Sequence, residues 1–296
     1  MRVAANGLEL ECEVVGDAAA APILLIMGLG MQLTAWPDDF LKALVGKGLR
    51  PIVFDNRDSG LSTKLDAAGM PNLLAAGMLT ALGLPIRSAY RIADMANDAL
   101  GLLDALHFER CHVVGVSMGG MIAQHLAAMH PGRVRSLAFV MSTSGARRLP
   151  GPTARARRAL LSRPRNPRDV ESQIDHAMGI WRMIGSPGFP VSDEDLRVRV
   201  GRSVRRSYYP QGVARQLVAV AASGDRTPLL GRIAAPTLVL HGRDDPLVPV
   251  ACGIDLAGKI PGAQLELIDG MGHDLPHPLI DRLADLIAAN CARAAS

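Results

Sequence analysis

One pentapeptide in the sequence could supply a nucleophile. Gly115-Val116-Ser117-Met118-Gly119 has the pattern Gly-x-Ser-x-Gly and stands between an apolar run and a stretch with helical periodicity. In a sharp turn from strand to helix, a serine presents its hydroxyl above the sheet, and the glycines let strand and helix approach closely. The positive end of the following helix would stabilise a negatively charged oxygen there. The pattern predicts that Ser117 is a catalytic nucleophile, with a plain structural turn as the alternative.

A serine hydroxyl needs an adjacent base, and the chain has eight histidines. His273 lies in the glycine-rich segment 269–274, directly after the last expected strand, where a loop can bring an imidazole to the edge of a sheet. The others lie beside helices, at a strand end or in the irregular middle of the chain: His107, His112, His125, His130, His176, His241 and His277. We therefore predict that His273 is the general base.

A catalytic histidine needs a carboxylate that fixes its tautomer and stabilises its charged form. The apolar run Thr237–Leu240 leads into His241-Gly242-Arg243-Asp244-Asp245-Pro246, so two aspartates follow the end of a strand. We favour Asp245 as the acid and expect Asp244 to serve the turn. The chain order Ser117, Asp245, His273 is that of α/β-hydrolases and differs from that of chymotrypsin-like and subtilisin-like proteases.

Stabilising the oxyanion of an acyl-transfer intermediate requires two backbone N–H donors. One is expected from Met118, the residue after the nucleophile, and the second from Leu29 in the glycine-rich loop 28–30 after an early strand. A plain strand-to-helix turn is the alternative for that loop. We further expect an apolar substrate pocket lined by Met27, Trp36, Trp181 and Met183 together with these two residues. No metal or organic cofactor is expected.

These residues are expected to be positioned by a sheet whose strands alternate with helices. Several apolar runs are continuous, as in strands buried on both faces; the predicted strands are Leu8–Val15, Pro22–Met27, Pro51–Asp55, Cys111–Val116, Val134–Met141, Pro236–His241 and Ala263–Ile268. Helical patterns lie between them at Trp36–Lys47, Tyr90–Leu106, Met118–Met129, Val250–Lys259 and Pro278–Cys291. This alternation predicts a mostly parallel α/β sheet flanked by helices.

The alternation of strand and helix patterns is absent from residue 146 to residue 215. We predict an α/β core made of residues 1–145 and 216–296, with residues 146–215 forming a helical cap above the site. A second irregular stretch, Lys64–Ser88, combines glycine and proline with leucine and methionine. We expect it to pack over the same opening.

The charge of the chain is concentrated in the expected cap. Residues 146–215 contain fifteen arginines, no lysine and six acidic residues, a net charge of +9, whereas the remainder carries −5. The region lacks interleaved aromatic residues and any helix-turn-helix or RNA-binding signature, which argues against a nucleic-acid partner. We expect these arginines to form a solvated surface, with an acidic substrate or a membrane as the alternative partner.

Composition indicates a folded globular protein. The 296 residues are 49% hydrophobic but only 3% aromatic, so aliphatic residues and methionine must build the core. No apolar run reaches the ~20 residues needed to cross a bilayer, and the first residues lack the apolar region of a signal peptide. The four cysteines are far apart in the sequence, which favours free thiols over disulfides or zinc. We expect a cytoplasmic protein; oligomeric state is left open, with a homo-oligomer as one alternative.

The residues resemble the α/β-hydrolase superfamily over nearly the whole chain. The resemblance rests on segments in family order: Gly28, Asp55-Asn56-Arg57-Asp58-Ser59-Gly60-Leu61-Ser62, the Ser117 elbow, His130-Pro131-Gly132-Arg133-Val134, Asp245-Pro246 and Gly272-His273. In the narrower group of bacterial carboxylesterases described next, the acid is the aspartate directly before proline, and this resemblance supports Asp245. The resemblance also implies that Asp55 and Arg57 are structural and stabilise the turn after their strand.

Bacterial carboxylesterases related to aclacinomycin methylesterase resemble the chain more narrowly, through Met27-Gly28, Ala35-Trp36-Pro37 and Gly270-Met271-Gly272-His273 with Pro276. Many other relatives have histidine where this chain has Met27. The resemblance implies a serine carboxylesterase that acts on small or medium apolar esters. A C–C bond hydrolase, lactonase, thioesterase, acyltransferase or cofactor-free perhydrolase would use the same three residues, and a non-catalytic ligand receptor is the alternative from another class.

Overall fold

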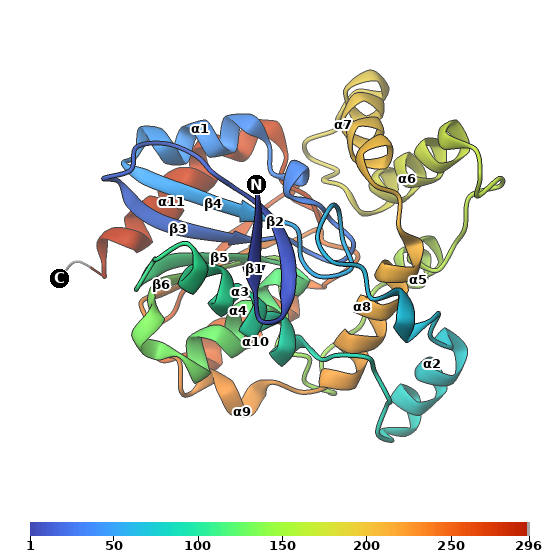
Figure 1. Cartoon of the computed structure of the whole chain (residues 1–296), viewed down its shortest axis with the longest axis horizontal. Helices are drawn as coiled ribbons and strands as arrows, with labels where there is room; N and C mark the ends of the chain where they lie inside the picture. The colour runs from blue at the N-terminus through green and yellow to red at the C-terminus, as the bar shows by residue number, and fades with distance from the viewer. Residues whose placement is uncertain (295–296) are drawn as a thin grey trace.

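The computed structural model describes residues 1–294, which form one eight-stranded sheet in the order β1-β2-β4-β3-β5-β6-β7-β8 (Figure 1). The first two strands pair antiparallel and β2 also runs antiparallel to β4, whereas all other neighbours are parallel. The strands are β1 (Arg2–Ala5), β2 (Leu8–Val14), β3 (Ala21–Ile26), β4 (Leu49–Phe54), β5 (Cys111–Val116), β6 (Val134–Val140), β7 (Thr237–Gly242) and β8 (Gln264–Ile268).

Helices cover both faces of this sheet. Figure 1 shows α1 and α11 together on one face, with α3, α4 and α10 on the other. The helices are α1 (Asp38–Gly46), α2 (Leu73–Leu82), α3 (Ile92–Ala105), α4 (Met118–Met129), α5 (Ala154–Leu160), α6 (Val170–Ile184), α7 (Asp193–Arg206), α8 (Pro210–Ser223), α9 (Thr227–Leu230), α10 (Val250–Lys259) and α11 (Ile280–Ala292). Short 3-10 helices span Leu33–Ala35, Asp66–Ala68, Pro131–Arg133 and His277–Leu279.

The apolar run of β3 shows why the sheet has two covered faces. Successive side chains of a strand point to opposite faces, and Ile23 and Leu25 join the apolar cluster that contains α1 and α11. Leu24 and Ile26 instead join the cluster that contains α3 and α4. All four are fully buried, so a continuous apolar run is what this position requires. The mostly parallel α/β sheet predicted from the sequence is confirmed.

Four helices, α5 to α8, fill the region predicted to be a cap, and α6 packs on α7 through its own small apolar cluster. The predicted boundary at residue 215 falls inside α8, which runs without a break from Pro210 to Ser223. The stretch 64–88, predicted to be irregular, contains α2, and this helix packs on α8. Figure 1 shows α6 and α7 standing beside the sheet, and α2 projecting at a separate corner.

Two further expectations can be compared with the described residues. Cys12, Cys111, Cys252 and Cys291 are all buried as free thiols. Within residues 1–294 no helix combines the length and hydrophobicity that crossing a membrane requires.

Candidate active site

Ser117 occupies a strained turn between β5 and α4. Its φ is +54° and its ψ is −117°, a backbone conformation that residues with side chains rarely adopt. The turn is tight because a Cβ placed on Gly119 would lie 2.0 Å from the carbonyl oxygen of Ile26. Only glycine fits there, which is the packing reason for the Gly-x-Ser-x-Gly pattern. The turn leaves Ser117 at the positive N-terminal end of α4.

Three predicted residues meet in one hydrogen-bonded chain. His273 Nε2 lies 3.0 Å from Ser117 Oγ, and His273 Nδ1 lies 2.7 Å from Asp245 Oδ2. The histidine and the aspartate are buried, whereas Ser117 is half-buried. All three follow the carboxyl ends of parallel strands, β5, β7 and β8, which is why residues 156 and 28 positions apart converge at one edge of the sheet.

Surrounding hydrogen bonds fit one tautomer of His273. Asp245 Oδ1 accepts from the backbone N–H groups of Leu247 and Val248, both at 2.8 Å. These donors stabilise the carboxylate, so Oδ2 is an acceptor for a proton on His273 Nδ1. The Nε2 atom is then unprotonated and able to accept the proton of Ser117.

Asp244 has a different environment. It is exposed, and its Oδ2 accepts a 2.8 Å hydrogen bond from the backbone N–H of Gly270. This bond joins the loops that follow β7 and β8. The neighbouring aspartates therefore differ in burial and in partners, with only Asp245 bonded to His273.

A second imidazole lies beneath the carboxylate. His241 is fully buried, and its Nε2 is 2.7 Å from the carbonyl oxygen of Val248 and 3.7 Å from Asp245 Oδ2. A carbonyl only accepts, so this nitrogen carries a proton. Burial lowers the pKa of His241, which keeps the ring neutral. The neutral His241 ring does not form a charged pair with Asp245, whose Oδ2 is hydrogen-bonded to His273.

The predicted oxyanion loop approaches Ser117 closely. A Cβ on Gly28 would lie 3.2 Å from Ser117 Cβ, so the backbone before Leu29 is in contact with the serine. Met118 is the first residue of α4, where backbone N–H groups have no partner within the helix. Both expected donors therefore belong to backbone segments that adjoin Ser117.

Side chains beyond β4 support this loop. Asn56 Nδ2 donates to the carbonyl oxygen of Met27 at 3.1 Å, and Ser59 Oγ donates to that of Met31 at 2.8 Å. Asp55 Oδ1 accepts from the N–H of Leu33 at 2.7 Å. The segment 55–59 thus holds the loop that is predicted to carry the oxyanion donor Leu29, in addition to its own turn.

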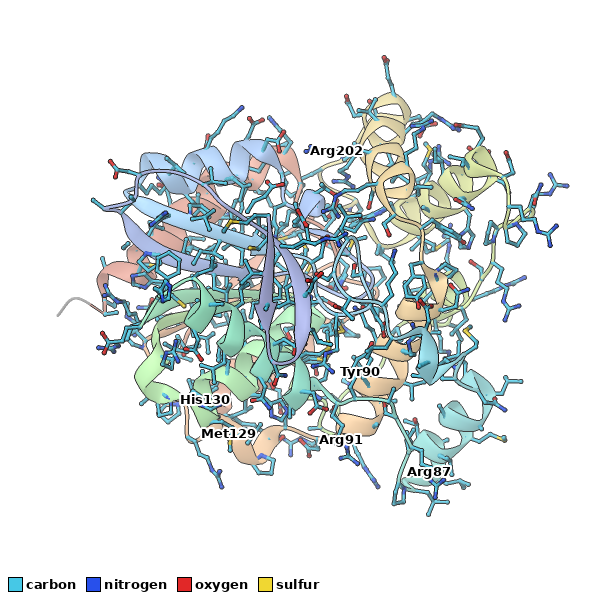
Figure 2. The ribbon with its side chains drawn as sticks, viewed as in Figure 1. Arg87, Tyr90, Arg91, Met129, His130 and Arg202 are labelled. Carbon is cyan, nitrogen blue, oxygen red and sulfur yellow. The ribbon has the colours of Figure 1, made fainter. Side chains whose placement is uncertain are left out.

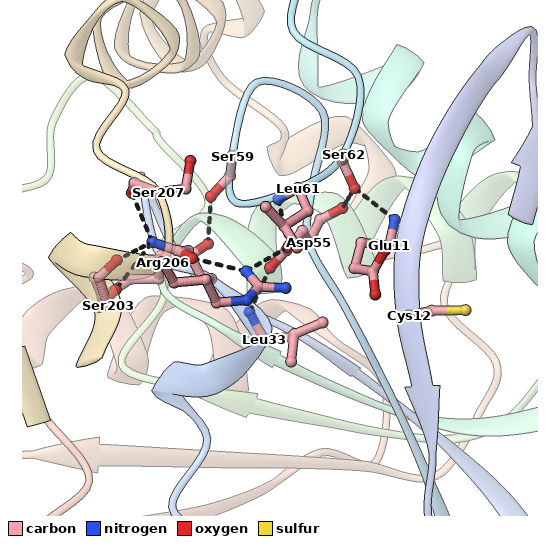
Figure 3. Close-up of polar contacts among 12 residues, drawn as sticks. Glu11, Cys12, Leu33, Asp55, Ser59, Leu61, Ser62, Ser203, Arg206 and Ser207 are labelled. Atoms are coloured by element: carbon pink, nitrogen blue, oxygen red, sulfur yellow. Dashed lines mark hydrogen bonds and ion pairs between the residues drawn. The ribbon is translucent and has the colours of Figure 1, made fainter. Parts of the chain in front are cut away.

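The end of α7 is tied to the same segment. Arg206 donates to Asp55 Oδ2 and to Gln32 Oε1, both at 2.7 Å (Figure 3). The amide nitrogen of Gln32 in turn donates to the carbonyl oxygens of Ser203 and Ser207, both at 2.8 Å. Asp55 is fully buried, so Arg206 compensates a charge that has lost its water. The end of α7 and the predicted oxyanion loop are thereby joined through charged and amide groups.

A second ion pair joins α8 to the core. Arg215 and Asp58 form two parallel hydrogen bonds of 2.8 Å, and both side chains are buried. Tyr90 adds a 2.8 Å bond to the same carboxylate. Burial raises the pKa of Asp58, but the bonds from Arg215, the Leu65 N–H and Tyr90 outweigh it and leave the pKa below its usual value. The carboxylate is therefore charged, and it anchors α8 against the core.

One glutamine on α8 reaches the oxyanion loop. Gln216, which is fully buried, accepts a 2.7 Å bond from the N–H of Gly30 and donates a 2.7 Å bond to the carbonyl oxygen of Arg57. Neither Gln216 nor Arg206 was among the residues expected from sequence. Glutamine in an apolar helix is the one signal that could have suggested a buried hydrogen-bonded site.

A buried carboxylate follows the catalytic histidine candidate. Asp274 accepts a short hydrogen bond from the hydroxyl of Ser186, which itself accepts from the N–H of Gly272 at 2.9 Å. Burial raises the pKa of Asp274, and the bond from Ser186 and the charge of Arg199 offset this only in part. The N–H of His273 donates to the carbonyl oxygen of Ile184 at 2.7 Å. The loop of His273 is therefore fastened to the end of α6.

The four residues expected to line the substrate pocket lie in different parts of the structure. Trp36 is 1% exposed and stacks on Phe40, with ring centroids 5.6 Å apart. It lines a surface hollow of about 230 Å³ against α7, whose described lining residues include neither Ser117 nor His273. Trp181 packs in the apolar cluster between α6 and α7. Both tryptophans thus pack against neighbouring side chains, and their contact with a substrate stays a prediction. Met27 directly precedes Gly28 of the oxyanion loop, and Met183 precedes Ile184, which contacts the His273 loop.

Comparison with known proteins settles the family. A family model described as the alpha/beta hydrolase fold matches residues 21–277. The chain belongs to the α/β-hydrolase family. The predicted family and fold are confirmed, and the protein is a hydrolase of this family.

Curated relatives of this α/β-hydrolase cover almost its full length. It is 29% identical over 299 residues to the rhodomycin D methylesterase DauP of Streptomyces sp. (strain C5), with 94% of this chain and 93% of the relative covered. It is 27% identical over 267 residues to a 2-hydroxy-6-oxononadienedioate/2-hydroxy-6-oxononatrienedioate hydrolase of Cupriavidus pinatubonensis, with 89% and 84% covered. A meta-cleavage product hydrolase structure from Pseudomonas fluorescens IP01 superposes with a TM-score of 0.74 at 20% identity, covering 99% of this chain and 98% of the other. That last likeness bears on the fold alone.

Proposed function

We propose that this α/β-hydrolase is a serine carboxylesterase that hydrolyses small to medium apolar carboxylic esters. The observation that carries the proposal is the 3.0 Å separation of His273 Nε2 from Ser117 Oγ at a strained elbow, with Asp245 on the opposite ring nitrogen. Similarity to rhodomycin D methylesterases over 94% of the chain supports an ester as the substrate.

The mechanism follows from these positions. His273 Nε2 takes the hydroxyl proton while Ser117 Oγ attacks the ester carbonyl carbon, and the carbonyl electron pair moves to its oxygen. The N–H groups of Leu29 and Met118 hold that oxyanion. When the tetrahedral intermediate collapses, His273 gives its proton to the departing alcohol, and an acyl group remains on Ser117.

Water then completes the cycle. His273 takes a proton from a water molecule while the water oxygen attacks the acyl carbon. His273 then returns this proton to Ser117 Oγ when the carboxylic acid leaves. Asp245 stays ionised throughout and stabilises the imidazolium in both halves. The chain's own residues and water therefore carry every proton in the reaction. We further propose that the protein acts in the cytoplasm.

Substrate contacts are proposed for Leu29, Met27 and Met183, which adjoin the loops that carry the oxyanion donor and His273. Methionine side chains are flexible and fit irregular apolar groups. The hydrogen bonds from Arg206 on α7 and Gln216 on α8 to the segments around the proposed oxyanion loop support the proposal that the cap helices hold this loop in place.

Hydrolysis of p-nitrophenyl esters from acetate to long acyl chains, together with apolar methyl esters, tests this proposal. We expect the highest kcat/KM at short or medium chains and a loss of about 10⁴-fold or more in Ser117→Ala and in His273→Ala. His277→Ala is the matched control, because His277 is exposed and, among residues 1–294, its ring pairs with surface Asp39 at 3.2 Å. This variant should keep the wild-type rate. Near-wild-type rates in Ser117→Ala, or no hydrolysis of any ester by the wild type, would contradict the proposal.

A further inference from the structure

The helix α2 is apolar on opposite faces. Residues 67–86 contain no Asp, Glu, Lys or Arg. The inner face of the helix packs on α8 through a small apolar cluster: Leu73, Ala76, Leu79 and Ile86 with Val218, Ala221 and Ala222. A helix that is apolar all round is normally buried all round. Here one face has no protein partner among the described residues.

The outward face forms a continuous stripe. Leu74 is 82% exposed, Met78 63% and Leu82 71%. These residues are four positions apart, so their side chains lie on one line along the helix. Met70 and Leu84, which flank the helix in the sequence, are also exposed and are counted with the stripe. We refer to these five side chains as the α2 stripe.

The shape of this region favours a lipid surface over a second protein. Figure 1 shows α2 projecting at a corner of the molecule, away from the sheet. From Leu74 to Leu82 the stripe is only about 12 Å long. A stable protein dimer typically uses about 20–30 residues on each partner, whereas the stripe consists of five side chains. A single helix face is enough for an interfacial helix, which sinks about 5–10 Å into the headgroup region.

The charges beside α2 are of the sign that suits anionic headgroups. Arg147 donates to the carbonyl oxygen of Gly83 at 3.2 Å, so its guanidinium lies at the carboxyl end of the helix. Arg87 is exposed and lies beside α2, and exposed Arg91 lies on the same side of the molecule (Figure 2). The nearest acid along the chain, Asp66, already accepts from the hydroxyl of Tyr209 at 2.5 Å. An apolar stripe with Arg87 and Arg147 beside it, and with Arg91 farther away on the same side, matches acyl chains beneath phosphate groups.

We propose that the α2 stripe docks this protein on the surface of an anionic phospholipid bilayer. Leu74, Met78 and Leu82 enter the boundary between headgroups and acyl chains, while Arg87, Arg91 and Arg147 lie among the lipid phosphates. The helix lies on the membrane and does not span it. Since α2 rests on α8, docking holds the protein by its cap side.

Flotation with vesicles tests the proposal directly. The intact protein is mixed with vesicles of phosphatidylcholine alone, or of an equimolar mixture of phosphatidylcholine and phosphatidylglycerol, and the floating fraction is measured. We expect the protein to float with the mixed vesicles and less with phosphatidylcholine alone. Met78→Glu should lower the partition coefficient about tenfold or more. Arg87→Gln should lower it about fivefold on the mixed vesicles only.

Matched controls are available elsewhere on the surface. Met129 is 55% exposed at the end of α4, and Figure 2 shows it apart from α2, beyond Arg91 along the lower part of the molecule, so Met129→Glu should float as the wild type does. Arg202, on α7, lies far from Arg87 in the same view, and Arg202→Gln should leave flotation unchanged. Hydrolysis of a water-soluble ester and thermal unfolding verify that the variants are folded. If Met78→Glu proves unstable, Leu74→Gln serves instead.

Three results would overturn the proposal. The first is a wild-type protein that floats with neither vesicle, and the second is a folded Met78→Glu that floats as well as the wild type. The third is a dimer of the wild type, seen by analytical ultracentrifugation, that Met78→Glu converts to a monomer without any vesicle binding. That outcome would assign the α2 stripe to a second copy of the chain.

Discussion

The side-chain oxygen of Gln216 accepts a 2.7 Å hydrogen bond from the backbone N–H of Gly30. The glutamine belongs to α8 and the glycine to the loop of the proposed oxyanion donor, Leu29. Since Gln216 is fully buried, no water competes for this bond. The orientation of the peptide that follows Leu29 is therefore held by a helix outside the sheet.

Replacing this glutamine should reduce turnover more than substrate binding. In Gln216→Leu the N–H of Gly30 loses its acceptor and the loop shifts relative to Ser117, so we expect kcat for a p-nitrophenyl ester to fall about 10- to 100-fold with a smaller change in KM. Gln173→Leu is the control, because Gln173 is also buried but bonds only within the cap, to the carbonyl oxygen of Pro167 at 2.8 Å. Equal losses of kcat in the two variants would refute a specific role for Gln216.

The two adjacent aspartates should respond differently to the same substitution. Asp245→Asn removes the charge that stabilises the His273 imidazolium and offers the wrong partner to Nδ1, so we expect kcat to fall about 10³- to 10⁴-fold. Asp244→Asn keeps an oxygen that can accept from Gly270 N–H and should change kcat less than about threefold. Steady-state kinetics on both purified variants decides this. The reverse ranking would identify Asp244 as the acid.

The parts of the site that sequence predicts are those with a local signal. Ser117 lies between an apolar run and a helical pattern, and Asp245 and His273 each follow the end of a strand. Parallel strands bring their carboxyl ends to one edge, so local patterns were enough to group the three residues. Their catalytic roles remain predictions that the variants above test.

Other features depend on contacts between segments that are distant in the sequence. Gln216 and Gly30 are 186 residues apart in the sequence, and Arg206 and Asp55 are 151 residues apart. Each pair meets only in the folded protein. The helix α2 was missed because residues that are apolar on every face show no helical periodicity. The residue type at position 36 fits both a pocket and a packed core, since both are apolar, and a substrate contact of Trp36 stays a prediction.

Loss of Arg206 should destabilise the protein. Arg206→Met leaves the carboxylate of Asp55, which is fully buried, without its charged partner, although the N–H groups of Leu33 and Leu61 still donate to it. We expect the free energy of unfolding to fall by about 2–4 kcal/mol in denaturant titrations.

Arg202→Met is the control for this measurement. Arg202 pairs with Asp38 at 3.6 Å, and both side chains are exposed. Exposed ion pairs contribute about 0–1 kcal/mol, so the control should lie close to the wild type. A loss in Arg206→Met no larger than in Arg202→Met would show that the link from cap to loop does not stabilise the fold.

Stability should fall in mild acid because of buried histidines. Burial lowers the pKa of His112 and of His125 to about 4, with smaller effects from Arg135 and Arg226, while both groups titrate near 6.5 when unfolded. Between these values the unfolded chain binds more protons than the folded one, so the free energy of unfolding decreases as the pH falls from about 6.5 to about 4. His112→Asn should show a smaller decrease over this range in urea titrations. An unchanged slope would exclude His112 as a source of the pH dependence.

Labelling by a fluorophosphonate ester tests the proposed nucleophile most directly. Only a serine that is activated by its histidine should displace fluoride from this reagent. We predict that the intact mass of the wild type rises by one adduct, and that peptide mapping places the adduct on Ser117. His273→Ala should label far more slowly, and Ser117→Ala should not label. An adduct on a different residue, or a wild type that takes up no label while folded, would contradict a Ser117–His273–Asp245 esterase.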